Sequence, residues 1–252
     1  MKVLRDNGLT IVLIVATMVT LTGMLMTGIS VYNDELVQHH QPAVSLTAYL
    51  TSGHFLSALF ENWESEFLQI SAYVALTAFL FQRGSAESKD PDGGAEQDED
   101  PDAHAGNADA PLPVRLGGLS ASLYAYSLGI ALFVLFLLSF ALHLQHSAAA
   151  EAVEALSHGK PAPTLWQHAG SAQFWFESFQ NWQSEFLSTA VLVVLSIFLR
   201  FRGSPESKPV AAPIPKREDR QCPNRRHGEM ASDGAISDYR NARSSTRFRR
   251  HA

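Results

Sequence analysis

Two long stretches without a charged side chain constrain this chain more than any other feature. They run from Gly8 to Tyr32 and from Leu116 to Leu142. A helix needs roughly 20 apolar residues to cross a bilayer, and a soluble helix needs a polar face that these stretches lack. The sequence therefore predicts that both segments are transmembrane helices.

Two shorter apolar stretches, Phe67 to Phe81 and Phe186 to Leu199, reach spanning length if their helices begin a turn or two earlier. The predicted fold is therefore an all-α membrane protein with four transmembrane helices. Lys2 and Arg5 give the first helix the basic start of a signal peptide as well. We expect this helix to be retained, because its apolar part is too long, no A-x-A cleavage site follows, and its counterpart in the second half is internal.

The chain is a tandem repeat. A shift of 119 residues aligns the two halves without a gap and places "NWESEFL", from Asn62, on "NWQSEFL", from Asn181. The same shift places "RGSAESK", from Arg83, on "RGSPESK", from Arg202. Identical polar residues at one fixed offset indicate a duplicated unit much more strongly than matched leucines do. We predict two parallel two-helix repeats, at residues 1–89 and 114–208.

The basic residues predict how the helices are oriented. Lys and Arg precede the first and third helices and follow the second and fourth, whereas the loops inside the two repeats contain only Lys160. By the positive-inside rule, both termini and the central linker are cytoplasmic. The two repeats then have the same orientation and are related by a pseudo-two-fold axis along the membrane normal.

Two polar segments are predicted to be disordered. Residues 90–113 contain eight acidic residues and no Lys or Arg, and residues 209–252 contain ten Lys or Arg and five acidic residues. Such segments bury too little apolar surface to offset the entropy lost on ordering. The basic tail has two candidate partners, anionic lipid and the acidic linker. Nucleic acid is not expected as a partner, because no aromatic platform accompanies the arginines.

The repeated Asn-Trp-x-Ser-Glu-Phe-Leu motif has two interpretations. In the first, Trp63 and Trp182 are anchors at the membrane interface and the acids are hydrated there. In the second, the repeated polar residues form a site, because an ionisable residue at the entrance of a transmembrane helix is a site hypothesis by default. The candidate residues of that site are Asn62, Ser65, Glu66, Asn181, Ser184 and Glu185.

We expect Glu66 and Glu185 to face the inside of the bundle, because a carboxylate that faces hydrocarbon loses its hydration. Two matching carboxylates near a pseudo-two-fold axis can bind a cation or share a proton. Trp63 and Trp182, on the opposite faces, should then meet lipid or the first and third helices. The second copy replaces two further acids by glutamine, and these acids, Glu61 and Glu64, are expected to be solvated.

The second repeated motif is predicted to stop and anchor each unit. Arg83 and Arg202 are interface anchors whose long side chains reach the membrane surface. Gly84 and Gly203 suit the C′ position that ends a helix. A regulatory or docking role is the alternative, because anchoring alone does not require the Glu and Ser of the motif.

No metal or cofactor is expected. The loops inside the repeats contain several histidines and carboxylates, but none has the spacing of a metal site. Only the pair Glu35/His39 recurs, as Glu154/His158, and a solvated loop accounts for it.

Four stretches, "LRDNGL", "VYNDE", "GHFLSALFENWESEFLQ" and "QRGSAESK", resemble a family of small bacterial integral membrane proteins that is a domain of unknown function. The resemblance covers most of residues 1–208 and does not extend to the tail. It implies a multi-pass protein of the bacterial inner membrane, but neither a reaction nor a catalytic residue.

Three functions remain open. The favoured one is a non-enzymatic four-helix membrane protein with an interaction or stress-related role. The second is a small transporter or channel that uses Glu66 and Glu185, as a homo-oligomer because four helices enclose little pore. A membrane enzyme ranks last, because the sequence offers no outward-facing nucleophile and base.

Overall fold

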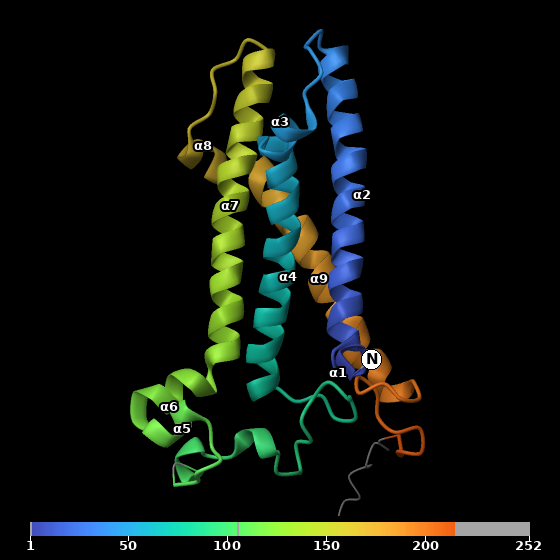
Figure 1. Cartoon of the computed structure of the whole chain (residues 1–252), viewed down its shortest axis with the longest axis vertical. Coiled ribbons are helices and arrows are strands. Elements are labelled where there is room, and N and C mark those ends of the chain that lie inside the picture. The colour runs from blue at the N-terminus through green and yellow to red at the C-terminus, as the bar shows by residue number, and fades with distance from the viewer. Residues whose placement is uncertain (1, 105, 215–252) are drawn as a thin grey trace, which may run out of the picture. The chain divides into compact units, whose positions relative to one another are not determined.

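The computed structural model describes residues 2–104 and 106–214, and this part of the chain contains helices and no strands. Its four long helices are α2 (Gly8–Gln38), α4 (Gly53–Phe79), α7 (Ser127–Ser157) and α9 (Ala172–Phe198). The all-α prediction is confirmed, and α4 and α9 begin earlier than expected, ahead of the acidic motif rather than inside it. The long helices alternate in direction, so the N-terminus, the central linker and the end of the described chain lie at the same end of the bundle (Figure 1).

The remaining helices are short. They are α1 (Lys2–Asp6), α3 (Leu46–Leu50), η1 (Glu96–Asp98), η2 (Pro101–His104), α5 (Leu112–Leu116), α6 (Gly118–Ala125) and α8 (Leu165–Ala169). The described residues of the acidic linker form the 3-10 helices η1 and η2, turns and the start of α5. The basic tail lies outside the described residues from residue 215 onward.

The 119-residue repeat extends to the boundaries of the helices. Both ends of α2, α3 and α4 coincide, after that shift, with the ends of α7, α8 and α9. The N-caps of α4 and α9 recur as well, since Ser52 and Ser171 each accept the backbone N–H three residues later at 3.2 Å. A cap of this kind satisfies an N–H that has no partner inside the helix. The repeated sequence therefore specifies the same helix starts in both halves.

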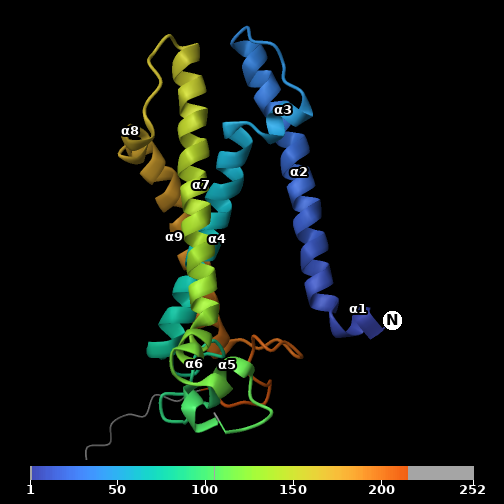
Figure 2. The same ribbon diagram turned by 60° about the vertical axis from the view of Figure 1, so that its left-hand side comes forward.

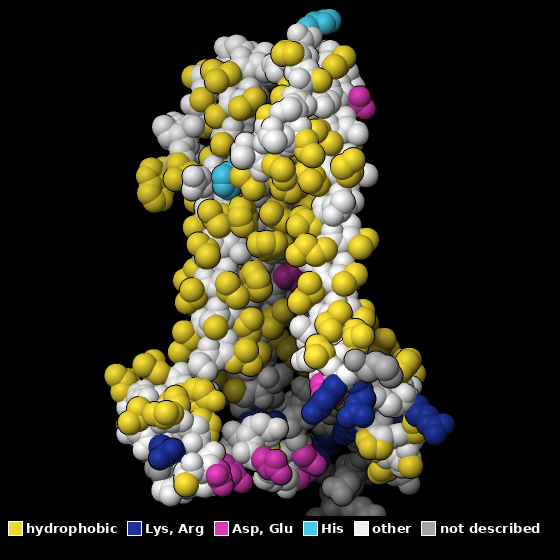
Figure 3. Space-filling view, viewed as in Figure 1, with side chains coloured by type: hydrophobic (Ala, Val, Ile, Leu, Met, Phe, Trp, Pro, Cys, Tyr) yellow, Lys and Arg dark blue, Asp and Glu magenta, His cyan; other side chains and the backbone are white. Residues whose placement is uncertain are grey.

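Two of the long helices, α2 and α7, are long and apolar enough to cross a membrane, judged by length and composition. In the described chain, α4 and α9 do not meet this criterion of length and apolar composition. In Figure 3, hydrophobic side chains cover the middle of the visible face, and most of its charged side chains gather toward the lower end. These features suggest that the protein associates with a membrane.

The uncharged stretch from Leu116 to Leu142 is not one helix, contrary to the prediction. Gly117 and Gly118 have φ values of 67° and 55°, a region that glycine adopts without steric cost. α6 starts there and ends before Tyr126, and α7 follows. The third long helix of the bundle is therefore α7 alone, which is the repeat equivalent of α2.

The core of the protein lies where α4 packs against α7 and α9. The start of α4 approaches α7 so closely that a Cβ atom on Gly53 would lie 2.7 Å from both the Ala150 nitrogen and the His146 oxygen. α2 makes no comparable contact with the other long helices, stands apart from them in Figure 2, and buries none of its residues. The two halves therefore share their local structure but not their packing.

Candidate functional site: a polar core between α4, α7 and α9

A fully buried carboxylate and imidazole pair lies at the centre of the α4–α7 contact. Glu64 and His143 are both 0% exposed, and 3.0 Å separates His143 Nδ1 from Glu64 Oε2. Trp182 of α9 donates its indole N–H to Glu64 Oε1 at 3.1 Å. Both carboxylate oxygens therefore have a donor, which a buried carboxylate needs because it has lost its water.

One of the two ring nitrogens of His143 is left without a hydrogen bond in the described chain. Its Nε2 atom is buried and has no hydrogen-bond partner among the described residues. An unpartnered buried polar atom is uncommon and costs about 1–3 kcal/mol. Since Nδ1 is engaged by Glu64, Nε2 is the position at which this pair can exchange a proton with a third group.

Aromatic rings enclose the pair. The His143 ring lies 5.1 Å from the Phe174 ring, centre to centre. Trp182 lies against Phe136 and Phe140 of α7, at 6.2 and 6.3 Å. These rings shield the pair, and they place Trp182 against α7, the third long helix. Trp63, its repeat equivalent, is 41% exposed.

Polar contacts between α4 and α9 continue on both sides of Glu64. Asn181 donates to Glu61 at 2.5 Å, and Gln69 donates to the hydroxyl of Thr189. Together with the Trp182 contact, these bonds join the two helices at three levels. α4 therefore presents a line of polar groups to the inside of the bundle.

The prediction is wrong for three acidic residues of the motif. Glu61, which was expected to be solvated, is half-buried and accepts the hydrogen bond of Asn181. Glu64 was expected to be solvated and is fully buried, whereas Glu66, which was expected to face inward, is exposed. Side chains two positions apart point to nearly opposite sides of a helix, so only one of these two can face the core. Glu185 is half-buried, and its carboxylate lies close enough to Glu66 to repel it.

The other predicted site residues bond mainly to their own helix. Ser65 is buried and donates to the Asn62 carbonyl at 2.8 Å, and Asn62 donates to the Ala58 carbonyl. Ser184 donates to the Asn181 carbonyl at 2.8 Å. Only Asn181 reaches across to another helix.

The sequence did contain a signal for the buried pair. Glu64 and His143 correspond, through the 119-residue shift, to Gln183 and Met24. The second motif has Gln183 in place of the acid, and the first long helix has Met24 in place of the histidine. This matched difference between the halves marks two residues that contact each other.

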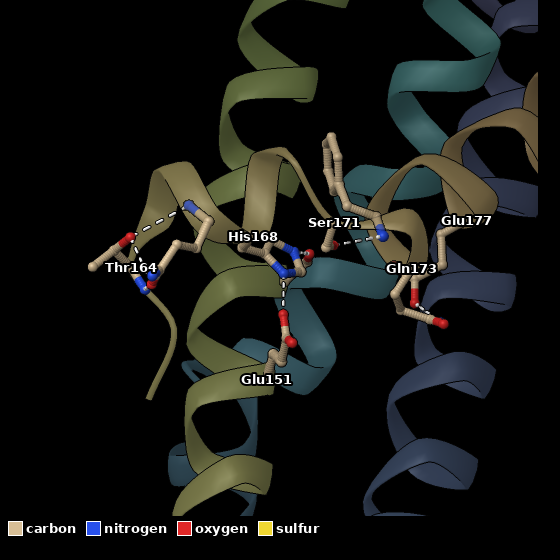
Figure 4. Close-up of polar contacts among 9 residues, drawn as sticks. Glu151, Thr164, His168, Ser171, Gln173 and Glu177 are labelled. Atoms are coloured by element: carbon tan, nitrogen blue, oxygen red, sulfur yellow. Dashed lines mark hydrogen bonds and ion pairs between the residues drawn. The ribbon is translucent and has the colours of Figure 1, made fainter. Parts of the chain in front are cut away.

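A second polar cluster lies further along α7, toward its C-terminal end. His168 of α8 bonds through Nε2 to the Ser147 hydroxyl. Through Nδ1 it bonds to the Glu151 carboxylate (Figure 4). Both clusters share one face of α7, because His143, Ser147 and Glu151 are spaced by four residues. The second cluster opens into a pocket of about 790 Å³ between the ends of α2, α4, α7 and α9.

The repeated Glu/His pairs meet in that pocket. The rings of His39 and His158 lie 5.6 Å apart, and both line the pocket with Glu35 and Glu154. No group of three or more His, Cys, Asp or Glu residues in the described chain is arranged to hold a metal ion.

The second repeated motif forms the same loop after α4 and after α9. Gly84 and Gly203 have φ values of 89° and 88°, but they do not end the helices, which stop earlier, at Phe79 and Phe198. In each loop the last serine accepts a backbone N–H from six residues before it, at 2.8 and 2.9 Å. As for the predicted anchors, Arg83 pairs with Asp92, and Arg202 is exposed.

The two loops bring a pair of glutamates together. The pKa of Glu87 is raised, mainly because the carboxyl group is buried. The hydrogen bond from Tyr73 lowers this pKa, and the neighbouring Glu206 carboxylate raises it further. The folded protein therefore holds this proton more tightly than the unfolded chain does. Stability is highest while Glu87 is protonated and falls as pH rises above the ordinary range of a glutamate, near pH 4.

Glu87→Gln is expected to stabilise the protein at pH 8 and to leave it unchanged at pH 4. Glutamine stays neutral at both values, so the charge that opposes folding at pH 8 is absent. We expect a rise in Tm of about 2 °C at pH 8, measured by tryptophan fluorescence in detergent. The exposed Glu206→Gln variant is the control and should gain less. An equal gain at both pH values would contradict the assignment.

The comparisons with known proteins give a family and no activity. No curated protein and no solved structure matches the chain. One family matches, described as "Domain of unknown function (DUF6766)", and it covers residues 1–218. The match spans both repeats, both polar clusters and both loops, and because it covers well over half of the sequence, the chain belongs to the DUF6766 family.

Proposed function

We propose that this protein is a four-helix integral membrane protein of the bacterial inner membrane that carries protons through the buried Glu64–His143 pair. The observation that supports it is the complete burial of this pair together with an open His143 Nε2. Ionisable groups inside a membrane bundle are costly, and where they occur they typically line ion or proton pathways. Transport of this kind requires no chemical transformation of a substrate.

Polar groups on both sides of the pair support a route along the bundle. Toward one end, His168 and Ser147 follow on the same side of α7. Toward the other end, Gln69 bonds to Thr189, and the Tyr73 hydroxyl donates to the Glu87 carboxylate at 3.0 Å. Imidazole suits such a route, because it can accept a proton on one nitrogen and release one from the other.

Proton flux into liposomes that contain the purified protein tests this proposal. A potassium gradient with valinomycin drives the flux, and a pH-sensitive dye inside the liposomes reports it. Glu64→Gln should lower the flux at least about tenfold, because an amide cannot take up and release the proton. His143→Met should have a similar effect, since it removes the partner nitrogen.

A second candidate route uses Glu66 and Glu185, as the repeated motif suggested. It is favoured by the closeness of these two carboxylates, which repel each other. The variant that carries Glu66→Gln and Glu185→Gln is therefore the matched comparison, and it should keep the flux of the wild type. Loss of flux in this variant but not in Glu64→Gln would favour the second route. No flux in the wild type would rule out both.

A further inference from the structure

The cluster of Ser147, His168 and Glu151 has the bonding order of a nucleophile, its base and the group that orients the base. Ser147 and His168 are 5% and 3% exposed. Glu151, whose side chain is 40% exposed, lines the same pocket as these two residues. A carboxylate only accepts hydrogen bonds, so His168 Nδ1 must be the donor to Glu151. His168 Nε2 is then the acceptor and takes the hydrogen bond of the Ser147 hydroxyl.

This arrangement is not needed to hold the helices together. The first repeat has Gly28, Tyr49 and Tyr32 at the corresponding positions. These residues also contact one another, because the Tyr49 hydroxyl lies against Gly28 and the two tyrosine rings lie 5.6 Å apart. Aromatic packing therefore makes the same contact in the first repeat. The serine, histidine and glutamate are specific to the second.

The start of α4 adds backbone donors beside the serine. The first N–H groups of an α-helix have no partner within the helix and carry its partial positive charge. In α4 these groups belong to Gly53 and His54, and both residues line the same pocket as Ser147. Gly53 lies directly against the turn of α7 that contains Ser147. Such donors suit the oxyanion that forms when a serine attacks a carbonyl group.

The pocket limits which substrates can reach the serine. Its volume of about 790 Å³ is in the range of small-molecule sites. Its lining contains four glutamates and one lysine, namely Glu35, Glu151, Glu154, Glu177 and Lys160. An anionic substrate would be repelled, so a neutral or cationic one is expected.

We propose that Ser147, activated by His168, is the nucleophile of an acyl-ester hydrolase site that takes neutral or cationic carboxylic esters. Ser147 Oγ bonds to the ester carbonyl carbon while His168 Nε2 takes its proton. The C–O bond to the alcohol then breaks, and His168 returns the proton to the departing alcohol. His168 next takes a proton from water, whose oxygen attacks the acyl-serine and releases the carboxylic acid, and Ser147 regains its proton. The net reaction is ester plus water to acid plus alcohol.

A fluorophosphonate probe with a neutral tag tests this site directly, because it bonds covalently to an activated serine with loss of fluoride. With the full-length protein in detergent, peptide mass spectrometry should find the label on Ser147. Ser147→Ala should abolish labelling, and His168→Gln should slow it at least about 100-fold. Ser57 and Ser157 line the same pocket, so Ser57→Ala and Ser157→Ala are matched controls that should label like the wild type.

Two further measurements separate catalysis from a structural role. Glu151→Gln should shift the pH dependence of the labelling rate to lower pH, because the charge that stabilises protonated His168 is lost. Hydrolysis of p-nitrophenyl butyrate should exceed that of mono-p-nitrophenyl succinate, which is anionic. Each variant is first checked for folding by size-exclusion chromatography and circular dichroism.

Absence of label on Ser147 in the folded wild type would overturn the proposal. So would a labelling rate that is unchanged in a folded His168→Gln variant. Glu64→Gln, which should stop the proposed proton flux, is expected to label at Ser147 like the wild type, so the two proposed activities can fail separately.

Discussion

Glu64→Ala is expected to destabilise the protein by about 3–5 kcal/mol, because it leaves His143 buried opposite an empty position. It also removes the acceptor of the Trp182 N–H. The measurement is reversible unfolding in mixed micelles with increasing SDS, followed by tryptophan fluorescence. Gln183→Ala, at the repeat equivalent, is the control. Gln183 is exposed, so its substitution should change stability by no more than about 0.5 kcal/mol.

The repeat equivalents of the buried pair suggest a double substitution that compensates for its loss. The first helix and the second motif carry Met24 and Gln183 where the buried pair has His143 and Glu64. The double variant Glu64→Gln with His143→Met should therefore lose less stability than the sum of the losses in the two single variants, since neither side chain is then left buried without its partner. A coupling energy of about 1–3 kcal/mol is expected between contacting residues. Strictly additive effects would show that the two side chains do not interact.

Gly53→Val is expected to lower the free energy of unfolding by about 3 kcal/mol. The cause is overlap of the added side chain with α7 and not the loss of a contact. The first added carbon would lie 2.7 Å from two backbone atoms of α7, and backbone atoms cannot rotate away as a side chain can. α4 and α7 would have to separate at this end, next to Ser147. Both the unfolding midpoint and the labelling of Ser147 should fall.

Gly23→Ala in α2 is the matched control for Gly53→Val. Apart from Gly23, its two chain neighbours and the nearby backbone of α2, no atom of the described residues lies within 4 Å of the Cβ position at Gly23. Alanine is the better helix former by up to about 1 kcal/mol, so this variant should be as stable as the wild type or slightly more so. A Gly53→Val protein with unchanged stability would contradict the close approach of the two helices.

The long helices could be predicted from the sequence, because their signals are local. Uncharged stretches mark α2 and α7, and the repeated serine caps fix where α4 and α9 begin. The breaks in the stretch from Leu116 to Leu142 could not be predicted as readily. One depends on Gly117 and Gly118, which adopt positive φ inside an apolar stretch, and the other falls at Tyr126, where neither a glycine nor a proline stands. Similarly, Gly84 was assigned to the end of α4, whereas the helix stops at Phe79.

The polar core was harder to predict, because comparison of the repeats favours residues that are the same in both. Glu66 and Glu185 are the same and lie toward the outside, whereas Glu64 and His143 occur once and contact each other. The helical period alone could not decide which side of α4 faces inward, since both sides carry polar residues. The contact with α7 decides it, and that contact joins residues 79 positions apart.

The two repeats have the same helix boundaries but pack differently, and this shows that each half can evolve separately. In a dimer of identical chains, each substitution appears on both sides of the symmetry axis and must be tolerated at both. A covalent tandem removes that restriction, because each half has its own codons. None of the four residues Glu64, His143, Ser147 and His168 has an identical counterpart in the other half. Fusion of the two units thus permits a single off-axis site without a duplicate, and either half can diverge while the other preserves the scaffold.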